Sequence, residues 1–495
     1  MMKLKKEEWI KNDKLKLYKF LDNITDEKIV VVQGLGFVGA VMSLVVANSK
    51  KNNYKVITVD IPTALSINKI NKYNSGEFPI IASDKKIEEY YNNAFSSNKI
   101  LATCSEEAFK FADIIIVDIN LDVQKANKLS GILSSYSVDI NPFTKAIKTI
   151  GENCKKDVLI LIETTVPPGT TEKIVKPTIK KELNKRNESI DEIKIAHSYE
   201  RVMPGPNYID SIENFYRVFS GIDSKSEVAA QEFLESIIST KNYPLTKLGN
   251  TTSTEMAKVL ENSFRAMNIS FMVEWSRFAE EAGVNLWEVI DAIKMRPTHK
   301  NMMYPGIGVG GYCLTKDPLL ADWAFSNLYE NKKNNKLSKS ISAVNTNDQM
   351  PVYAFNFLKS NTRNNLKNCK VLLFGVSYRS GVGDTRYSPV ERFYDYLISE
   401  GSKVSIHDPY VTYWEEKNIY TDFNHCRFED LKLNEYDIII FSTAHGEYSS
   451  STQLISLLKT LDKKFIIDLV GVLNEFDIKQ IKNKNNIKVI GRGDI

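Results

Sequence analysis

The segment from Lys28 to Asp60 constrains the fold more than any other part of this 495-residue chain. A β-branched run, Ile29 to Val32, is followed by three glycines in G-x-G-x-x-G spacing: Gly34, Gly36 and Gly39. An apolar stretch from Ala40 to Ala47 and a second strand-like run, Tyr54 to Val59, come next. Strand, glycine turn, helix and strand in this order predict a dinucleotide-binding unit of a parallel sheet, although a tight structural turn is the alternative.

The same segment indicates which dinucleotide would bind. A pyrophosphate is expected at the N-terminus of the helix that follows the glycines. Asp60 ends the second strand, where a carboxylate accepts a hydrogen bond from a ribose 2′-hydroxyl. This arrangement favours NAD over NADP.

The rest of the chain predicts an α/β fold. Further strands are expected at 114–117 and 158–162, and the runs 193–196 and 216–220 could extend the same sheet. Residues 254–295 contain a single glycine and no proline, and their apolar positions recur at helical spacing. A second α/β unit begins at Val371, with later strands at 403–406, 438–441, 465–467 and 487–490.

These patterns predict two Rossmann-like doubly wound parallel-sheet domains joined by a central helical domain with a long helix. The expected divisions are an N-terminal helical extension over 1–27, an NAD-binding domain over 28–245, a central domain over 246–345 and a C-terminal domain over 346–495. The extension packs on the first domain or remains a solvated tail. A long helix between two sheet domains often carries a dimer interface, so a homodimer or higher homo-oligomer is expected.

Composition excludes several functional classes. The net charge of +4 comes from 65 basic and 61 acidic residues, too balanced to predict a nucleic-acid or membrane partner. The five cysteines are scattered without a C-x-x-C pair, so neither a disulfide framework nor a metal site is expected. The first residues lack the apolar core of a signal peptide, and no apolar run reaches the roughly 18 residues of a membrane span. A cytoplasmic protein is expected.

Cys313 carries the most specific chemical signal. It follows three glycines in the run Gly308-Val309-Gly310-Gly311-Tyr312 and precedes Asp317 by four residues. If a helix begins near Leu314, the thiolate lies at the positive end of the helix dipole, and Asp317 shares its face. The alternative is a buried free cysteine in a glycine-rich turn.

Four other motifs contain polar residues suited to a catalytic site. Lys258, Asn262 and Arg265 lie on one face of the long helix, as an oxyanion-stabilising array or as a polar stripe of a packed helix. Thr165 follows a buried strand in Glu163-Thr164-Thr165-Val166-Pro167-Pro168, either beside a ligand crevice or in a capped helix start. Tyr199 to Gly205 and Tyr378 to Pro389 are loops with paired charges, which serve either a ligand or the solvated surface.

Taken in order, these motifs resemble those of the UDP-glucose/GDP-mannose dehydrogenase family over roughly residues 28–495. The resemblance implies oxidation of C6 of a nucleotide sugar from alcohol to carboxylate with two NAD molecules, in a surface-polysaccharide pathway. It implies a thiohemiacetal and then a thioester on the cysteine. Covalent capture would let one site perform two oxidations without losing an aldehyde.

The resemblance also assigns roles by matching position. Catalytic positions are Cys313, Lys258, Asn262, Asp317, Glu200 and Thr165. Cofactor-binding positions are Gly34, Gly36, Phe37, Val38, Gly39, Asp60, Thr165, Glu163 and Arg386. Substrate-binding positions are Arg201, Val202, Lys258, Asn262, Arg265, Arg296, Tyr304, Gly310, Tyr378 and Arg379.

The chain departs from the family pattern at several positions. Glu200-Arg201-Val202-Met203-Pro204 resembles the branch acting on UDP-N-acetylhexosamines such as UDP-GlcNAc or UDP-ManNAc, rather than UDP-glucose. Tyr312 stands where that branch often has histidine. Asp118-Ile119-Asn120 replaces a common Pro-Thr-Pro turn, which leaves the local NAD contact open. UDP-glucose 6-dehydrogenase, a two-electron β-hydroxyacid dehydrogenase and a non-enzymatic nucleotide-sugar sensor remain alternatives.

Overall fold

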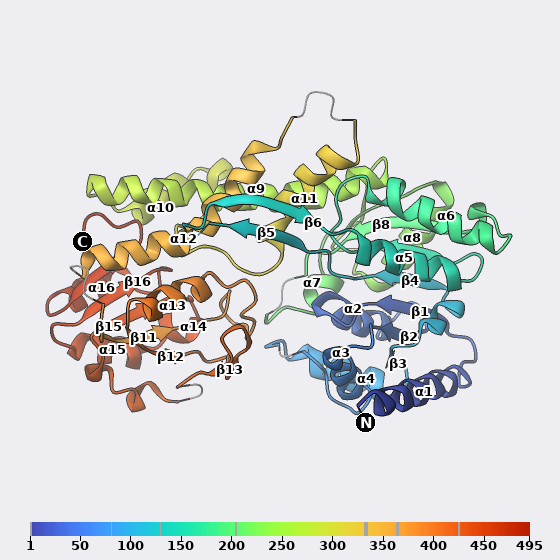
Figure 1. Ribbon diagram of the computed structural model, residues 1–495, viewed down its shortest axis with the longest axis horizontal. Helices are drawn as coiled ribbons and strands as arrows, with labels where there is room; N and C mark the ends of the chain where they lie inside the picture. The colour runs from blue at the N-terminus through green and yellow to red at the C-terminus, as the bar shows by residue number, and fades with distance from the viewer. Residues whose placement is uncertain are drawn as a thin grey trace. The chain divides into compact units, whose positions relative to one another are not determined.

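The computed structural model describes residues 2–80, 82–128, 130–202, 205–330, 335–362, 366–423 and 426–495, with side chains from residue 6 onward (Figure 1). The chain forms two compact units. Unit 1 comprises Met1–Val123, Val138–Val259 and Trp323–Asn335, and unit 2 comprises Gln124–Ser137, Leu260–Asp322 and Lys336–Ile495. Each unit contains its own sheet and its own hydrophobic core.

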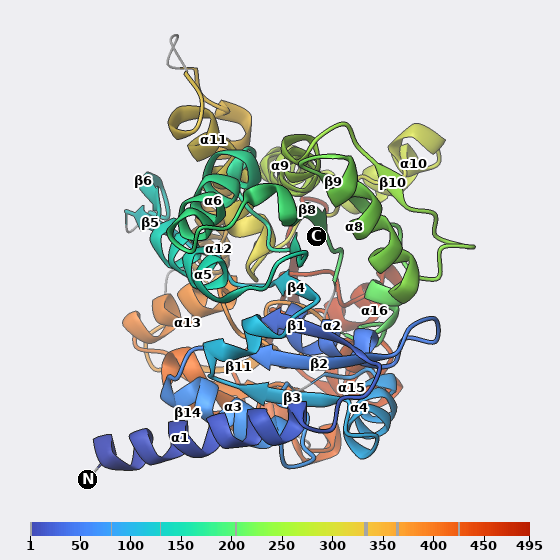
Figure 2. The ribbon, with the colours of Figure 1, turned by 90° about the vertical axis from the view of Figure 1, so that its right-hand side faces the viewer.

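The sheet of unit 1 has eight strands in the order β10-β9-β8-β7-β4-β1-β2-β3 (Figure 2). Their bounds are β1 Lys28–Gln33, β2 Tyr54–Val59, β3 Ile100–Thr103, β4 Ile114–Val117, β7 Leu159–Ile162, β8 Lys194–Tyr199, β9 Val218–Gly221 and β10 Thr246–Lys247. Neighbours pair in parallel except β8 and β9, which are antiparallel. The start of β9 therefore lies at the same edge as the carboxyl ends of β4, β7 and β8.

Helices cover both faces of this sheet, as a doubly wound fold requires. They are α1 Met2–Leu21, α2 Phe37–Ala47, α3 Ala64–Tyr73, α4 Lys86–Ser96, α5 Asn141–Asn153, α6 Lys176–Lys185, α7 Asp210–Glu213 and α8 Ser224–Ile237, with single turns at Glu106–Lys110, Thr171–Val175 and Ile190–Glu192. Residues Gly39 to Ala47 of α2 are all buried, which explains their nearly uniform apolar sequence.

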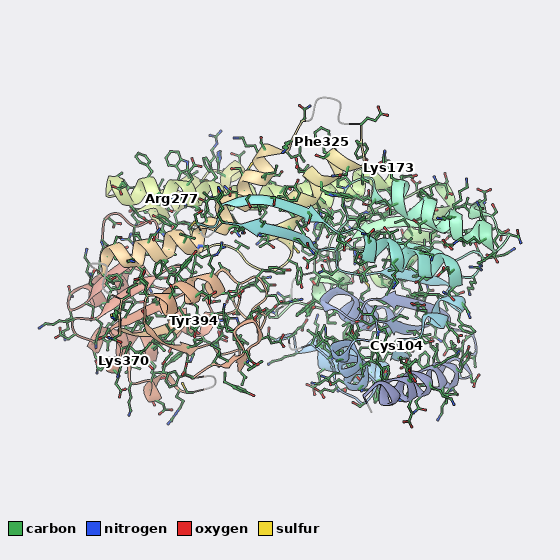
Figure 3. The ribbon with its side chains drawn as sticks, viewed as in Figure 1. Cys104, Lys173, Arg277, Phe325, Lys370 and Tyr394 are labelled. Atoms are coloured by element: carbon green, nitrogen blue, oxygen red, sulfur yellow. The ribbon has the colours of Figure 1, made fainter. Side chains whose placement is uncertain are left out.

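The N-terminal helix α1 packs against the edge strand β3. Leu17 and Phe20 are buried, and the Asp13 carboxylate accepts hydrogen bonds from Thr103 Oγ1 (2.6 Å) and from the backbone N–H of Cys104 (2.9 Å). Cys104 is labelled in Figure 3. Because an uncovered edge strand invites pairing with another chain, α1 protects this edge of the sheet.

The predicted long helix is α9, Thr251–Ala282, followed by α10, Leu286–Lys294. Gly283 has a φ of +69°, a left-handed conformation that ends α9. The Asn285 side chain then caps α10 by accepting hydrogen bonds from the N–H groups of Trp287 and Glu288.

The sheet of unit 2 is fully parallel, in the order β12-β11-β15-β16-β17. Its strands are β11 Lys370–Phe374, β12 Lys403–His407, β15 Ile438–Phe441, β16 Phe465–Asp468 and β17 Asn486–Val489. The helices after α10 are α11 Cys313–Asn327, α12 Ser338–Asn361, α13 Pro389–Ser399, α14 Gly446–Ser449, α15 Thr452–Thr460 and α16 Glu475–Lys482. Single turns occur at Pro297–His299, Glu415–Lys417, Phe428–Asp430 and Leu433–Glu435. The predicted α/β class with two Rossmann-like sheets is confirmed.

Two small hairpins complete the fold, and the sequence does not predict them. They are β5 Val123–Asn127 with β6 Leu133–Val138, and β13 Tyr413–Trp414 with β14 Ile419–Tyr420. Residues of the first hairpin bind α12: Lys125 forms an ion pair with Asp348 at 2.8 Å, and the N–H of Leu133 donates to Asn345 Oδ1 at 2.8 Å. A mostly polar hairpin held by such contacts gives no apolar alternation to recognise.

Among the described helices, none combines the length and the apolar character that a bilayer crossing requires. In the same part of the chain, no group of histidine, cysteine, aspartate or glutamate is arranged to hold a metal ion.

Candidate active site

The glycine turn between β1 and α2 has the geometry of a dinucleotide cradle. A Cβ on Gly39 would lie 2.1 Å from the carbonyl oxygen of Gly34, so only glycine permits this close turn. A Cβ on Gly36 would meet no atom within 4 Å, which leaves the backbone open to a ligand. Phe37 and Val38 begin α2, whose first amide groups favour an anion.

Asp60 lies where the adenosine ribose of a dinucleotide would be bound. Its Oδ2 accepts from the backbone N–H of Leu35 at 3.2 Å and its Oδ1 from that of Ile61 at 2.7 Å. These bonds fix the partly exposed carboxylate at the end of β2. The glycine turn and this acid together fit a bound NAD.

A buried ion pair lies at the carboxyl edge of the same sheet. Glu163 follows β7 and Arg217 precedes β9, and the two side chains are in direct contact with exposed fractions of 1% and 2%. Burial raises the pKa of Glu163, and Arg217 opposes that effect. Glu163 is predicted to contact the cofactor, and in the structure it pairs with Arg217. No sequence motif singles out Arg217.

Asp118 adds a third ionisable group at this edge. It follows β4, and burial together with the nearby charges of Glu163 and Glu200 raises its pKa well above the ordinary range. Its carbonyl oxygen lies 2.4 Å from where a Cβ on Gly34 would be, so β4 and the glycine turn are in contact. The cofactor cradle and the acidic cluster are therefore built on one framework.

Glu200 and Lys258 form a second charge pair at the carboxyl edge of the unit 1 sheet. Lys258 Nζ on α9 donates to the carbonyl oxygen of Glu200 at 2.7 Å and lies 3.7 Å from its Oε1. Arg201 donates to the backbone of Tyr216 at 2.8 Å and to the Tyr199 hydroxyl at 3.0 Å. The predicted Lys258, Glu200, Arg201 and Val202 thus lie together in unit 1, while Met203 and Pro204 of the same motif are outside the described residues.

The loop that contains Thr165 is held by a carboxylate from α9. Glu255, fully buried, accepts from the backbone N–H groups of Gly169 (2.5 Å) and Thr171 (2.7 Å). Burial raises its pKa to about 7, while these hydrogen bonds lower it. Glu255 is three residues before Lys258, so one helix face positions both the ammonium and the Thr165 loop.

Cys313 occupies the first position of α11 and is exposed, as the helix-terminus prediction required. Its glycine loop rests on the turn that follows β11. A Cβ on Gly311 would lie 2.8 Å from Cε2 of Tyr378, and one on Gly310 would lie 2.5 Å from the carbonyl oxygen of Tyr387. The N–H of Gly311 also donates to the carbonyl oxygen of Arg386 at 3.1 Å. The loop glycines therefore permit close contact between the cysteine loop and this turn.

Asp317 lies one helical turn after Cys313 and is fully buried. Its Oδ2 accepts from Asn262 Nδ2 at 2.7 Å, and its Oδ1 forms an ion pair with Lys316 at 3.1 Å. Asp317 fixes the orientation of the Asn262 amide, because the amide nitrogen must point toward the carboxylate. The predicted Cys313, Asn262 and Asp317 therefore belong to one cluster in unit 2.

Arg386 is held between two partners of the same unit. Its guanidinium forms a two-point contact with Asp384 (2.8 and 2.6 Å) and lies over the ring of Tyr312, 4.6 Å from the centroid. Tyr312 thus provides an aromatic support. Burial raises the pKa of Tyr378 to about 12, with smaller contributions from Asp384 and Cys313.

Four other predicted substrate residues have less connection to this cluster. Arg265, Arg296 and Arg379 are exposed. The Tyr304 ring stacks on Trp287 with centroids 4.8 Å apart, and its hydroxyl accepts from Lys294 at 3.2 Å. The contacts described for Tyr304 are with α10, so its role stays a prediction.

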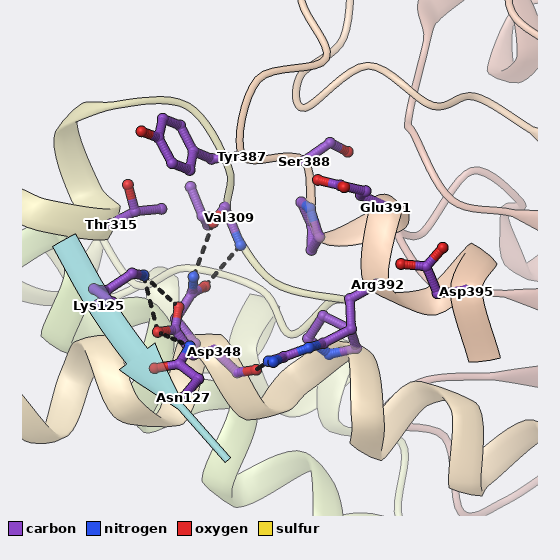
Figure 4. A pocket seen from close by; sticks show the side chains of 13 residues that line it. Lys125, Asn127, Val309, Thr315, Asp348, Tyr387, Ser388, Glu391, Arg392 and Asp395 are labelled. Atoms are coloured by element: carbon purple, nitrogen blue, oxygen red, sulfur yellow. Dashed lines mark hydrogen bonds and ion pairs between the residues drawn. The ribbon is translucent and has the colours of Figure 1, made fainter. Parts of the chain in front are cut away.

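A cavity of about 310 Å³ lies behind the cysteine loop in unit 2 (Figure 4). Its lining includes Val309 and Thr315, on either side of Cys313. Lys125 pairs with Asp348, and Lys417 pairs with Glu391 at 3.1 Å and with Asp395 at 2.8 Å. Arg392 donates to the carbonyl oxygen of Asp348 at 3.1 Å. These contacts order the wall of the cavity.

Three family models match consecutive parts of the chain. They describe the NAD binding domain, the central domain and the UDP binding domain of the UDP-glucose/GDP-mannose dehydrogenase family, over residues 27–238, 252–347 and 372–475. The chain belongs to the UDP-glucose/GDP-mannose dehydrogenase family. It is thus a dehydrogenase with an NAD-binding domain and a UDP-binding domain.

Individual relatives in this family align with nearly the full length of the chain. A UDP-N-acetyl-D-mannosamine dehydrogenase of Pyrococcus horikoshii is 30% identical over 469 residues, 94% of this chain and 100% of the relative. The enzyme of that name from Methanococcus vannielii is 31% identical over 471 residues, 94% and 97% of the two chains. The solved structure of a Pyrococcus horikoshii UDP-D-ManNAc dehydrogenase has a TM-score of 0.75 and 28% identity, covering 94% of this chain and 100% of its own.

The Glu163–Arg217 pair gives a stability prediction for this dehydrogenase. Arg217→Met leaves a carboxyl buried without its cation, which should lower the free energy of unfolding by about 3–5 kcal/mol at about pH 8. The raised pKa lets Glu163 take up a proton as the pH falls, so the loss should shrink at about pH 5. Urea unfolding at both pH values measures the effect. The free energy of unfolding is taken from the first transition of each unfolding curve.

The matched control is Arg427→Met. Arg427 forms an exposed ion pair with Asp430, which should contribute less than about 1 kcal/mol. A loss for Arg217→Met that is equal at the two pH values, or no larger than the control, would contradict the buried-pair account.

Proposed function

We propose that this dehydrogenase oxidises C6 of a UDP-N-acetylhexosamine from alcohol to carboxylate in two successive oxidations at one site. The carrying observation is Cys313, exposed at the start of α11 on a glycine loop and beside the ordered Asn262–Asp317 pair. A two-electron dehydrogenase needs no such cysteine. NAD, when bound, supplies the hydride acceptor for both oxidations.

Lys258 and Asn262 act on the oxygen of C6. They are four residues apart in α9 and share a face of that helix. In the first oxidation, Lys258 takes part in removing the hydroxyl proton. In later steps the ammonium and the amide donate to the negative oxygen of each tetrahedral species. Asp317 holds the amide in the donating orientation.

Cys313 retains the aldehyde between the two oxidations. Its sulfur adds to the carbonyl carbon and a proton goes to the oxygen, which gives a thiohemiacetal. Loss of hydride from that carbon and of the hydroxyl proton gives a thioester. Water then adds to the thioester carbon, the C–S bond breaks and the thiol is restored. Thr165, Glu200 and Asp317 are proposed to hold this water and to accept its proton.

The UDP-sugar is proposed to bind through the residues that the family resemblance assigns to it. Arg201, whose guanidinium is fixed by Tyr199 and Tyr216, is placed to recognise the anionic or polar part of the substrate. Val202, Arg265, Arg296, Tyr304, Gly310, Tyr378 and Arg379 are proposed as further contacts. Arg386 is proposed to reach the cofactor, with Asp384 and Tyr312 holding it in place.

The N-acetylated sugar is supported by two observations. Glu200-Arg201-Val202 matches the branch acting on UDP-N-acetylhexosamines, and the relatives from Pyrococcus horikoshii and Methanococcus vannielii are named UDP-N-acetyl-D-mannosamine dehydrogenases. UDP-ManNAc is therefore the first substrate to test. The uronic acid product is proposed to enter surface-polysaccharide biosynthesis.

Replacing the nucleophile tests the covalent route. Cys313→Ser should abolish formation of the uronic acid because the hydroxyl cannot form the thioester, whereas wild-type protein should give two NADH per sugar consumed. Quantifying NADH and acid by absorbance and mass spectrometry measures both. Cys426→Ser, which changes a partly exposed cysteine elsewhere in unit 2, is the control and should retain activity. One NADH per sugar in wild-type protein, or undiminished acid in Cys313→Ser, would contradict the mechanism.

A substrate panel tests the sugar. We expect NADH formation to be fastest with UDP-ManNAc or UDP-GlcNAc and at least about tenfold slower, in kcat/KM, with UDP-glucose, UDP-GalNAc and GDP-mannose. Tenfold corresponds to about 1.4 kcal/mol of transition-state stabilisation, the scale of one or two pocket contacts. A preference for UDP-glucose would assign the chain to a different substrate branch while leaving the covalent route intact.

We also propose that two copies of the chain associate through α9. Five large apolar side chains recur at helical spacing on this helix, with exposed fractions between 45% and 64%: Leu260, Phe264, Phe271, Trp275 and Phe278. Neighbouring rings contact one another, with centroids 6.0 Å apart for Phe271 and Trp275. A continuous apolar stripe on an exposed helix suits a self-complementary interface between identical subunits.

Phe278→Glu tests this interface. Loss of a buried aromatic side chain, about 1.5–3 kcal/mol, should weaken dimerisation at least about tenfold. Sedimentation velocity across a concentration series measures the dissociation constant. Val228→Glu alters an exposed apolar residue on α8 and should leave association unchanged. Equal association of both variants and the wild type would exclude α9 as the interface.

A further inference from the structure

Asp118 takes no part in the proposed mechanism. Asp118 follows β4, directly beside the end of β7, where Glu163 begins the next loop. Glu200 follows β8, the next strand of the sheet. Parallel pairing of these strands brings three carboxyl groups to one edge.

The other two carboxyl groups at this edge each have a cation beside them. Arg217 pairs with Glu163, and Lys258 lies 3.7 Å from Glu200. Arg201, a third cation here, is directed to the backbone of Tyr216 and the Tyr199 hydroxyl. Among the described residues Asp118 Oδ2 is covered and has no partner, and a buried carboxyl without its own cation takes up a proton more readily than it remains charged.

Asp118 is the group best placed to hold that proton. Burial and the charges of Glu163 and Glu200 raise the pKa of Asp118. The neighbouring Glu163 raises the pKa of Asp118, whereas Asp118 lowers that of Glu163, so the proton is expected on Asp118.

The buried atoms of the cluster support this arrangement. Asp118 Oδ2, Glu163 Oε2 and Arg217 Nη2 are covered, and hydrogen-bond geometry gives none of them a partner among the described residues. An unpaired charge on covered oxygens is costly, and a proton held by the two carboxyls lowers that cost. Asp118 is partly exposed as a residue, whereas Glu163 is 1% exposed, so Asp118 is the nearer of the two to solvent.

We propose that Asp118 is a proton-holding residue of this active site, sharing one proton with Glu163 and passing protons from the buried edge to solvent. The inference rests on the proposed function for its role in turnover. When water attacks the thioester, its oxygen bonds to the carbonyl carbon and its proton goes to Glu200. That proton moves through the cluster to Glu163, and Asp118 releases its own proton to solvent. The pair then again holds one proton, so charge and protons balance.

Infrared spectroscopy tests the proton itself, without substrate or cofactor. A protonated carboxyl has a C=O stretch distinct from that of a carboxylate, and exchange into D₂O shifts it. Wild-type protein at about pH 7 should show this band, and Asp118→Asn should lose it. Asp122→Asn, an exposed neighbour, should keep it. Glu255→Gln and Asp468→Asn separate the contributions of two further buried carboxyls, whose pKa values burial raises to about 7 and about 6. Absence of the band in wild type, or an unchanged band in Asp118→Asn, would overturn the proposal.

Kinetics test the role in turnover. Asp118→Asn retains the size and the hydrogen-bond donor of the protonated acid but cannot release a proton. We expect kcat for acid formation to fall at least tenfold and to lose one ionisation from its pH profile, with little change in KM. An unchanged kcat and pH profile would remove Asp118 from the proton path.

The infrared and the activity measurements can fail independently, so together they distinguish the role of Asp118 from the proposed function. If the infrared band assigns a proton to Asp118 but no nucleotide sugar is oxidised, the proposed function fails and the proton-holding pair stands. If acid forms and the band is absent from wild type, the function stands and this inference fails. Cys313→Ser should retain the band, because the proton is present before any chemistry.

Discussion

Parallel pairing of β4, β7 and β8 is the constraint on which the chemistry of unit 1 depends. It places the residues that follow each strand at one edge, although they are far apart in the sequence. Glu163 and Arg217 can be buried there only because they contact each other, since either charge alone would be costly. Asp118, which follows β4, lies against the glycine turn. Cofactor cradle and acidic cluster are thus consequences of one strand order.

Features fixed by nearby residues could be predicted from the sequence. The glycine turn and the start of α11 at Cys313 each depend on a few neighbouring residues. The long helix α9 could be predicted because its apolar spacing extends over many turns. The predicted strands differ from the observed ones by only a few residues at their ends, because most of them are short, mainly apolar runs.

Features that depend on distant residues could not be predicted. Arg217 lay within a run expected to be a strand, and only its partner Glu163, 54 positions away, explains why a charge is buried there. Glu255 lies among other polar residues of α9, and only its contacts with Gly169 and Thr171, far away in the sequence, distinguish it. No local sequence pattern marks Glu255. For Arg217, the one sequence signal is a charged residue within an apolar run.

The buried carboxyls also couple the architecture of unit 1 to proton uptake. Glu163 and Glu255 have raised pKa values in the folded protein, so the folded state binds protons that the unfolded chain releases. Their contribution to stability is therefore fully present below the ordinary pKa of a glutamate and declines as pH rises, for Glu255 until about pH 7. Arg217 limits this decline for Glu163, and backbone N–H groups limit it for Glu255. Proximity of like charges at this sheet edge thus has a physical cost, and proton uptake by a buried carboxyl lowers it.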